Sequence, residues 1–504
     1  MLTNQYVLGI DHGTGGCKVT CLASNGKVIS DAYVSYPSYY PHPLWVKQDP
    51  EQWIEAAILG VQKTLKGFSD QERQHVSAIG FSAPHHVAVL LDQNNRVLRN
   101  AIMWNDQRSG EQVKELTETS GKMIMSITNN SPTPTWTLSH LKWISDNEPE
   151  VFEQIHKIVF LKDYVRYRFC GELSTDYIEA EGTLLFDMNQ HEWSESVCSM
   201  ISLDRKVLPN VYLPTDQAGN LTTKMAEKIG VRSGIPLIIG TADTAAEVYG
   251  SGATDIGDGV VKLATAGNVT VVTDQLSKNP KLTSYEHVIK GNYYHNSGTN
   301  FAASSLRWFK EGFCQDLQQN IIDEKIYGVL DQEIENIGPG AEGLIFQPYL
   351  NGERCPHWDP NLRGSFFGCT ARHNRSHFAR AILEGVGYSL RDASHELNIP
   401  QMDAMRIIGG GSKGKVWVQI IADILNSEME IPKESDASFG VCLLTATAIG
   451  WFSDLKEAVN QCQVVIDRVI PDLNNREMYD EMFHIYKELH SQTKNLTHRL
   501  TKLH

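Results

Sequence analysis

The sequence predicts an α/β protein that is built from two large, related domains. The chain has 504 residues, more than the roughly 250–300 residues at which a single hydrophobic core stops growing. Two segments half a chain apart share one pattern, in which a short apolar strand, a glycine-rich turn and a second strand follow one another. Strong helical repeats of apolar residues come later in the chain. Together these features indicate two α/β halves that each open with a hairpin.

Both hairpins can be located in the sequence. The first lies in QYVLGIDHGTGGCKVTCLAS, where strands at residues 6–10 and 19–22 flank a turn that is rich in glycine. The second lies in GDGVVKLATAGNVTVVTD, where strands at residues 260–264 and 269–272 flank the turn TAGN. Because hairpins with glycine turns are common, the repeated pattern is by itself a weak sign that the halves are related.

The boundary between the domains is expected in VRSGIPLIIGTADTAAEVYGSGATD. Residues 236–240 are apolar and typical of a buried strand, and residues 241–249 are mostly small and typical of the opening of a helix. Two glycines then interrupt the pattern. We therefore predict one domain at residues 1–252 and another at residues 253–504.

Two long helices are predicted in the second half. The first, in RSHFARAILEGVGYSLRDASHEL, is expected to have Ser376 as its N-cap and to carry an apolar stripe at i+4 spacing. The members of that stripe are Phe378, Ile382, Val386 and Leu390. The second helix, around residues 476–490, carries the stripe Met478, Met482, Ile485 and Leu489. Both stripes are predicted to face the core.

The composition is that of an ordinary globular protein and argues against several functions. The net charge is −15 and no block of Lys and Arg occurs, which argues against a nucleic-acid surface. No run of about 18 apolar residues is present, so no membrane span is expected. The start MLTNQYVLGIDHG lacks the pattern of a secretory signal. Nine scattered cysteines without a CxxC pair favour free thiols in a reducing compartment, so we expect a cytoplasmic protein.

The segment DHGTGGCK, residues 11–18, has the groups that bind a phosphate. Glycines let backbone N–H groups approach an anion closely, Thr14 adds a hydroxyl donor, and Lys18 adds a compact positive charge. Asp11, at the end of the first strand, could hold a hydrated Mg²⁺ ion. The alternative is a plain glycine hairpin with a surface aspartate, and the segment alone favours neither.

Two segments of the second half offer similar groups. Thr265 and Gly267, in ATAGNVT, could receive a second phosphate, although this segment alone favours an ordinary hairpin. IIGGGSKGKVW reads as a strand, a Gly-Gly-Gly turn and a helix, which together make a cradle for a nucleotide. It is not a Walker A loop, because Val416 stands where Mg²⁺ binding requires Ser or Thr.

Asp243, in GTADTAAEVYG, follows a buried strand and stands at or near the start of a helix. The helix dipole keeps a carboxylate there ionised, so Asp243 could accept a proton from a substrate hydroxyl as a general base. The small residues Ala242, Ala245 and Ala246 leave room for a ligand. By residue type alone, an aspartate that caps the helix is the more common explanation.

The segment GFSAPHHVAVLLD is predicted to form a strand, a turn and a strand, with His85 and His86 in the turn. Because adjacent residues of a strand point to opposite faces, we expect that the two imidazoles do not share a metal ion. The chain has no HExxH segment, no zinc-binding spacing of Cys and His, and no GxSxG segment. Both histidines remain candidates for substrate contacts.

Taken in order, these segments make the chain resemble the FGGY family of carbohydrate kinases, and within it most of all the xylulokinases. The resemblance extends from about residue 5 to about residue 450. Its most specific stretch is YLNGERCPHWDPNLRGSFFGCTARHNRSHFARAILEGV, and IMWNDQR and GGGSKGKVWVQIIADIL also match. Cys369 is a departure, since the family usually has an aliphatic residue there.

The resemblance implies an α/β fold of two actin-like ATPase domains, which are ribonuclease H-like, on either side of a catalytic cleft. It implies that a sugar hydroxyl is phosphorylated, with ATP and Mg²⁺ as cofactors and a small sugar or polyol as the substrate. It also allows a homodimer, and it gives no reason to expect a nucleic-acid or membrane partner.

Individual residues receive roles from the resemblance and from their positions. Asp243 aligns with the catalytic base, and Asp11 and Asp243 are assigned to Mg²⁺, which they would hold through water. The residues assigned to ATP are Thr14, Gly15, Gly16, Lys18, Thr265, Gly267, Gly410, Gly411 and Lys415. The residues assigned to the sugar are Ser82, His85, His86, Trp104, Asp106 and Asp243.

The departures from the family lie mostly where the sugar is bound. Xylulokinases usually have Ser-Gly-Gln-Met-His where residues 82–86 of this chain are Ser-Ala-Pro-His-His. We predict a kinase that converts a ketopentose, with D-xylulose first, to the 5-phosphate. The alternatives are a kinase for another ketose, an alditol or a sugar acid, and a nucleotide-dependent binding protein on the same fold without kinase activity.

Overall fold

The computed structural model describes residues 5–503, which form two compact units. The first unit contains the chain up to Thr254 and two later segments, Ser284–Tyr293 and Glu434–Gln463. The second unit contains Asp255–Thr283, Tyr294–Lys433 and the chain from Val464 onward. The first unit is therefore assembled from three separate stretches of the sequence.

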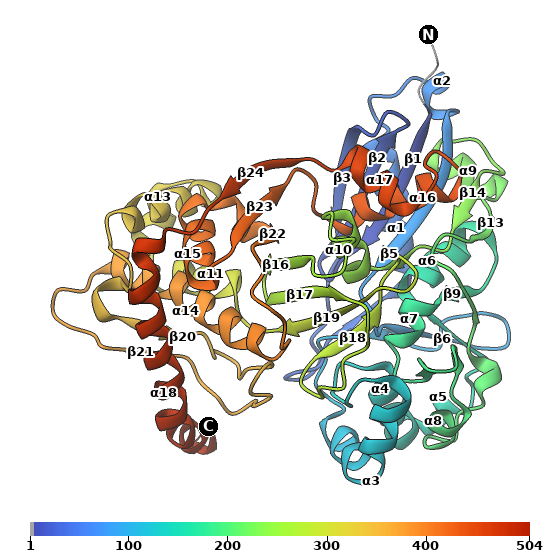
Figure 1. Cartoon of the computed structure of the whole chain (residues 1–504). Coiled ribbons are helices and arrows are strands. Elements are labelled where there is room, and N and C mark those ends of the chain that lie inside the picture. Colours follow the sequence, from blue (N-terminus) through green and yellow to red (C-terminus); the bar gives the residue numbers. More distant parts are fainter. Residues whose placement is uncertain (1–4, 504) are drawn as a thin grey trace. The chain divides into compact units, whose positions relative to one another are not determined.

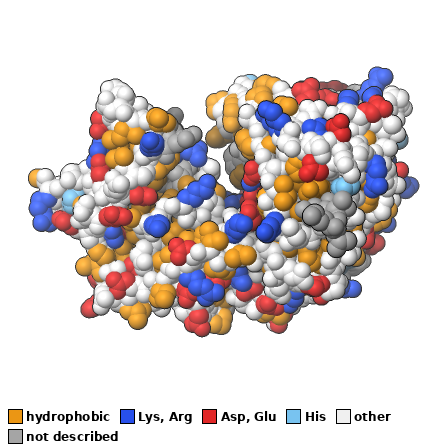
Figure 2. All heavy atoms as spheres, turned by 90° about the horizontal axis from the view of Figure 1, so that it is seen from above, with side chains coloured by type: hydrophobic (Ala, Val, Ile, Leu, Met, Phe, Trp, Pro, Cys, Tyr) orange, Lys and Arg blue, Asp and Glu red, His pale blue; other side chains and the backbone are white. Residues whose placement is uncertain are grey.

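The surface carries both signs of charge. On the face drawn in Figure 2, Lys and Arg side chains are interspersed with Asp and Glu side chains and with hydrophobic ones. Within residues 5–503, no helix combines the length and the apolar character that a membrane crossing needs.

The first unit is built on a mixed sheet that starts from the predicted hairpin. The order of its strands is β13 (Gln217–Asn220), β14 (Pro236–Ile238), β5 (Val76–Ala83), β1 (Tyr6–His12), β2 (Gly16–Ala23) and β3 (Val28–Ser35), with β15 (Thr241–Ala242) also paired to β5. β1 and β2 are antiparallel, as predicted. β5 runs parallel to both β1 and β15, so these three strands end at the same edge of the sheet.

Helix α16 (Ala437–Ala448) comes late in the chain but packs against β1 and β5, two strands from the start of the sequence (Figure 1). Glycines make room for it. A Cβ atom at Gly9 would lie 2.1 Å from the carbonyl oxygen of Ser438, and one at Gly80 would lie 2.0 Å from the Thr445 hydroxyl. Helix α10 (Asp243–Gly250) packs beside α16. A residue at the start of α16, late in the sequence, can therefore lie beside the end of β1.

The remaining elements of the first unit surround this sheet. Its other helices are α1 (Pro50–Thr64), α2 (Asp70–Arg73), α3 (Gly110–Thr128), α4 (Thr137–Asn147), α5 (Pro149–Phe152), α6 (Leu161–Cys170), α7 (Tyr177–Glu181), α8 (Glu195–Ser199), η1 (Arg205–Val207), α9 (Thr223–Ile229) and α17 (Leu455–Cys462). Four small strand pairs are β4 (Lys47–Gln48) with β7 (Ala101–Ile102), β6 (Ala88–Leu91) with β8 (Lys157–Phe160), β9 (Ser174–Asp176) with β12 (Asn210–Tyr212), and β10 (Phe186–Asp187) with β11 (Glu192–Trp193).

The second unit repeats the plan of the first. Its sheet contains, in order, β19 (Tyr293–Gly298), β17 (Gly267–Thr273), β16 (Gly259–Leu263), β22 (Ala404–Ile408), β23 (Glu428–Pro432) and β24 (Val465–Val469). The predicted hairpin of β16 and β17 is antiparallel, and β16 pairs in parallel with β22. In the first unit β1 pairs with β2 and with β5 in the same antiparallel and parallel senses. The predicted similarity of the two halves is therefore confirmed at the level of strand pairing.

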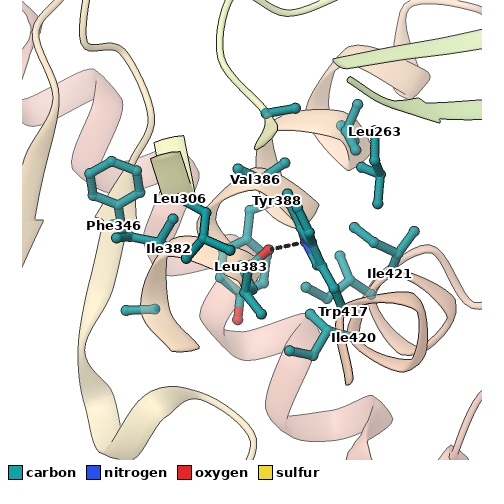
Figure 3. Packing of buried hydrophobic residues seen from close by; sticks show 14 of the residues in the cluster. Leu263, Leu306, Phe346, Ile382, Leu383, Val386, Tyr388, Trp417, Ile420 and Ile421 are labelled. Carbon is teal, nitrogen blue, oxygen red and sulfur yellow. Dashed lines mark hydrogen bonds between the residues drawn. The ribbon is translucent and has the colours of Figure 1, made fainter. Parts of the chain in front are cut away.

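The core of the second unit lies under α14 (Arg375–His395) and α15 (Lys415–Leu425). Figure 3 shows Trp417 of α15 among Leu383, Val386 and Tyr388 of α14, with its indole nitrogen aimed at α14. That nitrogen donates to the Leu383 carbonyl oxygen over 3.3 Å. The hydrogen bond satisfies the one polar atom of a large buried side chain.

Two helix predictions need correction. The N-cap of α14 is Asn374, whose side chain accepts from the N–H of Ser376, so Ser376 lies inside the helix. In α18 (Arg476–Leu500), Met478 and Ile485 of the predicted stripe are exposed. The core face consists of Tyr479, Met482, Phe483, Tyr486 and Leu489. The predicted stripe, spaced by 4, 3 and 4 residues, was drawn through aliphatic side chains alone and missed the aromatic ones that make up most of the buried face.

The second unit is completed by short helices and a strand pair. They are α11 (Ala303–Phe313), α12 (Gln315–Asn320), α13 (Asp323–Glu335), η2 (Ala341–Gly343), β20 (Ile345–Gln347) with β21 (Ser365–Phe367), η3 (Gly410–Lys413), η4 (Leu473–Asn475) and η5 (Thr501–Leu503). Strand β18 (Thr283–Glu286) begins at the point where the chain returns to the first unit.

Candidate active site

Three parallel strand ends of the first unit bring together residues from distant parts of the sequence. Asp11 of β1 pairs in register with Ser82 of β5, and Ser82 pairs with Thr241 of β15. Asp243 follows β15 directly and is the first residue of α10. In open α/β sheets, ligands bind at the carboxyl ends of the strands. This edge is therefore the place in the unit where a site is expected.

Asp243 is half-buried, and its carboxylate is oriented by its own helix. Its Oδ1 accepts from the backbone N–H of Thr244 over 2.6 Å and from the Thr244 hydroxyl over 3.2 Å. Oδ2 has no such partner among the described residues, which leaves this oxygen available to a ligand. The N-cap of α10 is Ala242, so the explanation of Asp243 as an ordinary N-cap is wrong.

Asp11 lies among other carboxylates. Burial, followed by the charges of Asp243, Glu247 and Asp436, raises the pKa of Asp11 well above its usual value, against a smaller opposing effect of the Ser82 hydroxyl. Its Oδ1 is buried and has no hydrogen-bond partner within the described part of the chain. A bound cation would relieve this repulsion.

The same carboxylates suit a hydrated metal ion better than a fully coordinated one. Among the side chains that the structure describes, no group of three or more Asp, Glu, His or Cys residues is placed to hold a metal ion. Mg²⁺ keeps several of its waters and is usually held by one or two carboxylates together with phosphate oxygens. Asp11 and Asp243 fit that pattern, since each has an oxygen without a protein partner.

The turn between β1 and β2 is held open by its neighbours. The N–H of Gly13 donates to the carbonyl oxygen of Gly16 over 2.8 Å. The indole nitrogen of Trp104 donates to the Thr14 hydroxyl over 2.9 Å. Gly15 is exposed, whereas a Cβ atom at Gly16 would lie 2.5 Å from the ring of Tyr33. The turn therefore has one side that is packed by protein and one side that is open.

Lys18 is engaged by protein carboxylates. Its ammonium group lies 2.6 Å from Asp436 and 3.1 Å from Asp31. Burial lowers the pKa of Lys18, but these two carboxylates outweigh it and raise the pKa above its usual value. Asp436 is in turn the N-cap of α16. Sequence reasoning missed Asp436, because only the fold places the start of α16 beside β2.

His86 has a fixed orientation and no charge. It lies in a left-handed backbone conformation with φ of 77°, and its Nδ1 is hydrogen-bonded to the carbonyl oxygen of Gly182. The ring meets Trp136 edge to face at 4.6 Å. Burial lowers the pKa of His86 to about 3. With its proton on Nδ1, the neutral ring presents Nε2 as a hydrogen-bond acceptor.

His85 packs on the other side of His86, and both histidines lie in a turn between β5 and β6. Its ring stacks on Tyr285 at 4.6 Å, and the two imidazoles lie 5.3 Å apart. The expectation that they point to opposite faces is therefore wrong, because the strand ends at Ala83 and the chain turns at His86. Both ring nitrogens of His85 are buried without a partner among the described residues.

The segment IMWNDQR supplies one half-buried and one buried side chain. Trp104 reaches the turn between β1 and β2 through its bond to Thr14. Asp106 is buried, and both of its oxygens accept from the Arg108 side chain, over 2.9 Å and 2.7 Å. Its Oδ2 also accepts from the N–H of Val46 over 2.5 Å. Asp106 therefore fixes the loop that presents Trp104.

The remaining predicted residues belong to the second unit, at the ends of β16 and β22. Thr265 is exposed in the turn after β16, and the N–H of Thr299 donates to the Gly267 carbonyl oxygen over 2.8 Å. After β22, a Cβ atom at Gly410 would meet no atom within 4 Å, whereas one at Gly411 would lie 2.7 Å from Leu263. Lys415 is exposed at the first position of α15.

Comparison with known proteins gives matches along nearly the whole chain. Residues 6–250 match the N-terminal domain of the FGGY family of carbohydrate kinases, and residues 260–449 match its C-terminal domain. The xylulose kinase of Lactococcus lactis is 33% identical over 99% of both chains.

Solved structures agree with these matches. The ligand-bound xylulose kinase of Lactobacillus acidophilus has a TM-score of 0.89 at 25% identity and covers 97% of this chain and 98% of its own. The gluconate kinase of the same organism has a TM-score of 0.88 with the same identity and coverage. The fold is therefore shared by kinases of different sugars and does not by itself identify the substrate.

Proposed function

Because the chain belongs to the FGGY family of carbohydrate kinases, we propose that it transfers the γ-phosphoryl group of ATP to a hydroxyl of D-xylulose, which gives the 5-phosphate and ADP. The observation that carries the proposal is the pair Asp11 and Asp243. They stand at the ends of β1 and β15, the two strands that flank β5 at this edge, and each has a carboxylate oxygen that no described residue occupies. Phosphoryl transfer needs such a base and such a charge site.

Asp243 is the general base of this proposal. Its Oδ1 is held by Thr244, so Oδ2 would accept the proton of the attacking sugar hydroxyl. The position of Asp243 at the N-terminus of α10 favours the ionised form that a base requires. Because the small side chains of Ala245 and Ala246 lie behind it, the helix can approach the substrate closely.

Asp11 and Asp243 would hold Mg²⁺ through water. When bound, Mg²⁺ supplies positive charge to the phosphate oxygens. The same ion would remove the repulsion between Asp11 and the carboxylates around it, and this explains why negative side chains are clustered here. Lys18 compensates their net charge only in part. We therefore assign Lys18 to the charge balance of the site as well as to the nucleotide.

Two sets of residues are assigned to the nucleotide, and each is described within its own unit. In the first unit, the open side of the turn at Thr14, Gly15 and Gly16 offers N–H and hydroxyl donors to a phosphate. In the second unit the corresponding groups are Thr265, Gly267, Gly410, Gly411 and Lys415. Lys415 lies at a helix N-terminus, where an added positive charge suits an anion.

The sugar is assigned to Ser82, His85, His86, Trp104 and Asp106 in addition to Asp243. Among these, Nε2 of His86 accepts a hydrogen bond from a sugar hydroxyl, and Trp104 offers an aromatic face. A sugar acid would present a carboxylate, which favours a cation. Both imidazoles are uncharged, since burial lowers the pKa of each, and the nearby Lys162 is bound to Asp163 and Asp176. These contacts favour a neutral ketose over an aldonate.

The test is a coupled ADP-release assay on the full chain with ketoses, alditols and aldonates as separate substrates. D-xylulose should give the highest kcat/KM. A higher value for gluconate would move the assignment to a sugar-acid kinase. ATP hydrolysis that no sugar stimulates would instead support a nucleotide-dependent binding protein on this fold.

A further inference from the structure

The segment Ser284–Tyr293 belongs to the first unit although it follows the second hairpin in the sequence. The Asn130 side chain makes two hydrogen bonds to the backbone of this segment. Its Nδ2 donates to the Ser284 carbonyl oxygen and its Oδ1 accepts from the Ser284 N–H, each over 2.9 Å. The Glu181 carboxylate accepts from the N–H of Glu286 over 2.9 Å. These bonds fix the path of the segment across the first unit.

The fixed segment places Tyr285 in a closed group of four rings, which we call the aromatic box. His85 stacks on Tyr285 at 4.6 Å with an angle of 17° between the rings. His85 meets His86 at 5.3 Å, and His86 meets Trp136 at 4.6 Å. Trp136 lies 6.2 Å from Tyr285 and closes the box. Trp136 and Tyr285 are almost fully buried, at 1% and 4% exposure.

The aromatic box explains how His86 keeps an unfavourable backbone conformation. A left-handed conformation is uncommon for a residue other than glycine and costs roughly 1–3 kcal/mol unless the surroundings enforce it. The bond from His86 to Gly182 and the ring contacts with Trp136 and His85 supply that enforcement. Tyr285 supports His85 from the outer side, so it acts on His86 through His85.

We propose that Tyr285 is a positioning residue for the sugar, which sets the direction of the His86 ring and thereby the choice among substrates. The proposal rests on the proposed function, since it takes Nε2 of His86 as the acceptor of a sugar hydroxyl. The group that this acceptor recognises is a sugar hydroxyl, because a hydroxyl can donate to Nε2 and a carboxylate cannot. Substrate choice then depends on a residue outside the segment that contains the histidines.

The aromatic ring of Tyr285, rather than its hydroxyl, is what the proposal requires. Tyr285→Phe keeps the ring and should retain the sugar KM of the unaltered chain. Tyr285→Leu fills the space without a ring, and Tyr285→Ala removes the support entirely. Since an aromatic pair contributes roughly 0.5–1.5 kcal/mol beyond burial, both should raise the sugar KM by up to about tenfold. The KM for ATP should change less than twofold.

Steady-state kinetics with D-xylulose and ATP, together with thermal melts, would test this. Tyr293→Ala, at the other end of the same segment, is the matched control and should leave the sugar KM unchanged. Tyr285→Leu provides the answer if Tyr285→Ala does not fold. In a double-mutant cycle, Tyr285→Leu should add little to His85→Ala, because both remove the same support from His86.

The outcomes separate this inference from the proposed function. An unchanged sugar KM in Tyr285→Leu, a Tyr285→Phe variant as impaired as Tyr285→Leu, or fully additive effects with His85→Ala would overturn the inference while the enzyme remained a xylulose kinase. Equal losses for sugar and ATP, with a lowered melting temperature, would reduce Tyr285 to a packing residue. If the unaltered chain phosphorylated no sugar, the proposed function and this inference would both fail.

Discussion

The carboxylate of Asp243 lies close enough to that of Asp11 to raise its pKa, although the two residues come from opposite ends of the first unit's longest stretch of chain. Strand register brings them together, since Asp11 aligns with Ser82 and Ser82 with Thr241, two positions before Asp243. Repulsion between two carboxylates is unfavourable for folding. That such a repelling pair is kept at the ends of these strands is explained if a cation and a phosphate bind there during the reaction.

Asp243→Asn should abolish sugar phosphorylation while ATP still binds. The amide cannot accept the hydroxyl proton, and loss of a general base costs typically about 10²- to 10⁴-fold in rate. The measurements are kcat in the ADP-release assay and ATP affinity by calorimetry. Asp70→Asn is the matched control, because Asp70 is exposed and also opens a helix, α2. Turnover of Asp243→Asn near that of the control would remove Asp243 as the base.

Asp11→Asn should make the protein more stable and less active. The substitution removes the charge of Asp11, which is unfavourable because it is buried and because Asp243, Glu247 and Asp436 repel it. In the absence of divalent cations the melting temperature should therefore rise by about 1–3 °C. Added Mg²⁺ with ATP should stabilise the unaltered chain more than the variant. A lower melting temperature for Asp11→Asn would show that the carboxylate is satisfied by the protein itself.

The sequence predicts local features of the fold well and long-range pairing poorly. The hairpins at β1 and β16, and the helix that opens at Asp243, follow from glycine turns and apolar runs that lie within a few residues of one another. The position of Asp436 beside Lys18 depends on α16 returning to the first unit, which no local pattern encodes.

The residues proposed to contact the sugar show the same limit. The histidine pair was found from its segment, but the contact of Tyr285 with His85 depends on a segment that joins the first unit from beyond the second hairpin. The orientation of the pair was also mispredicted, because strand alternation does not apply in a turn with a left-handed residue. Only the assembled structure identifies which residues surround the imidazoles.

Gly411→Ala and Gly410→Ala should have different effects on the second unit. A Cβ atom at Gly411 would lie 2.7 Å from Leu263 and 2.9 Å from the Trp417 ring, whereas one at Gly410 would meet nothing within 4 Å. Overpacking of this kind typically costs about 1–3 kcal/mol, so thermal melts of Gly411→Ala should show a loss of stability. Gly410→Ala should fold normally and raise the KM for ATP, because it narrows the turn that is assigned to the nucleotide. Equal melting temperatures for the two variants would contradict the packing argument.

Glu353→Gln should flatten the dependence of stability on pH. Glu353 is buried, and burial raises its pKa to about 7, although the N–H groups of Asn300 and Arg354 and the Ser389 hydroxyl donate to it. A glutamate in an unfolded chain has a pKa of about 4.3. The folded state therefore binds a proton at Glu353 more tightly than the unfolded state does. The resulting contribution to the free energy of unfolding is complete below about pH 4.3 and is lost as the pH rises through 7. The difference between the two pKa values corresponds to at most about 4 kcal/mol.

Glutamine keeps an oxygen for the two N–H donors and offers its amide to Ser389, while it carries no charge to desolvate. Melting temperatures of the unaltered chain should fall between pH 5 and pH 8 more steeply than those of Glu353→Gln. Glu488→Gln, at an exposed position of α18, serves as the control and should follow the unaltered chain. Parallel curves for the unaltered chain and Glu353→Gln would mean that the hydrogen bonds from Asn300, Arg354 and Ser389 already offset the burial of the Glu353 charge.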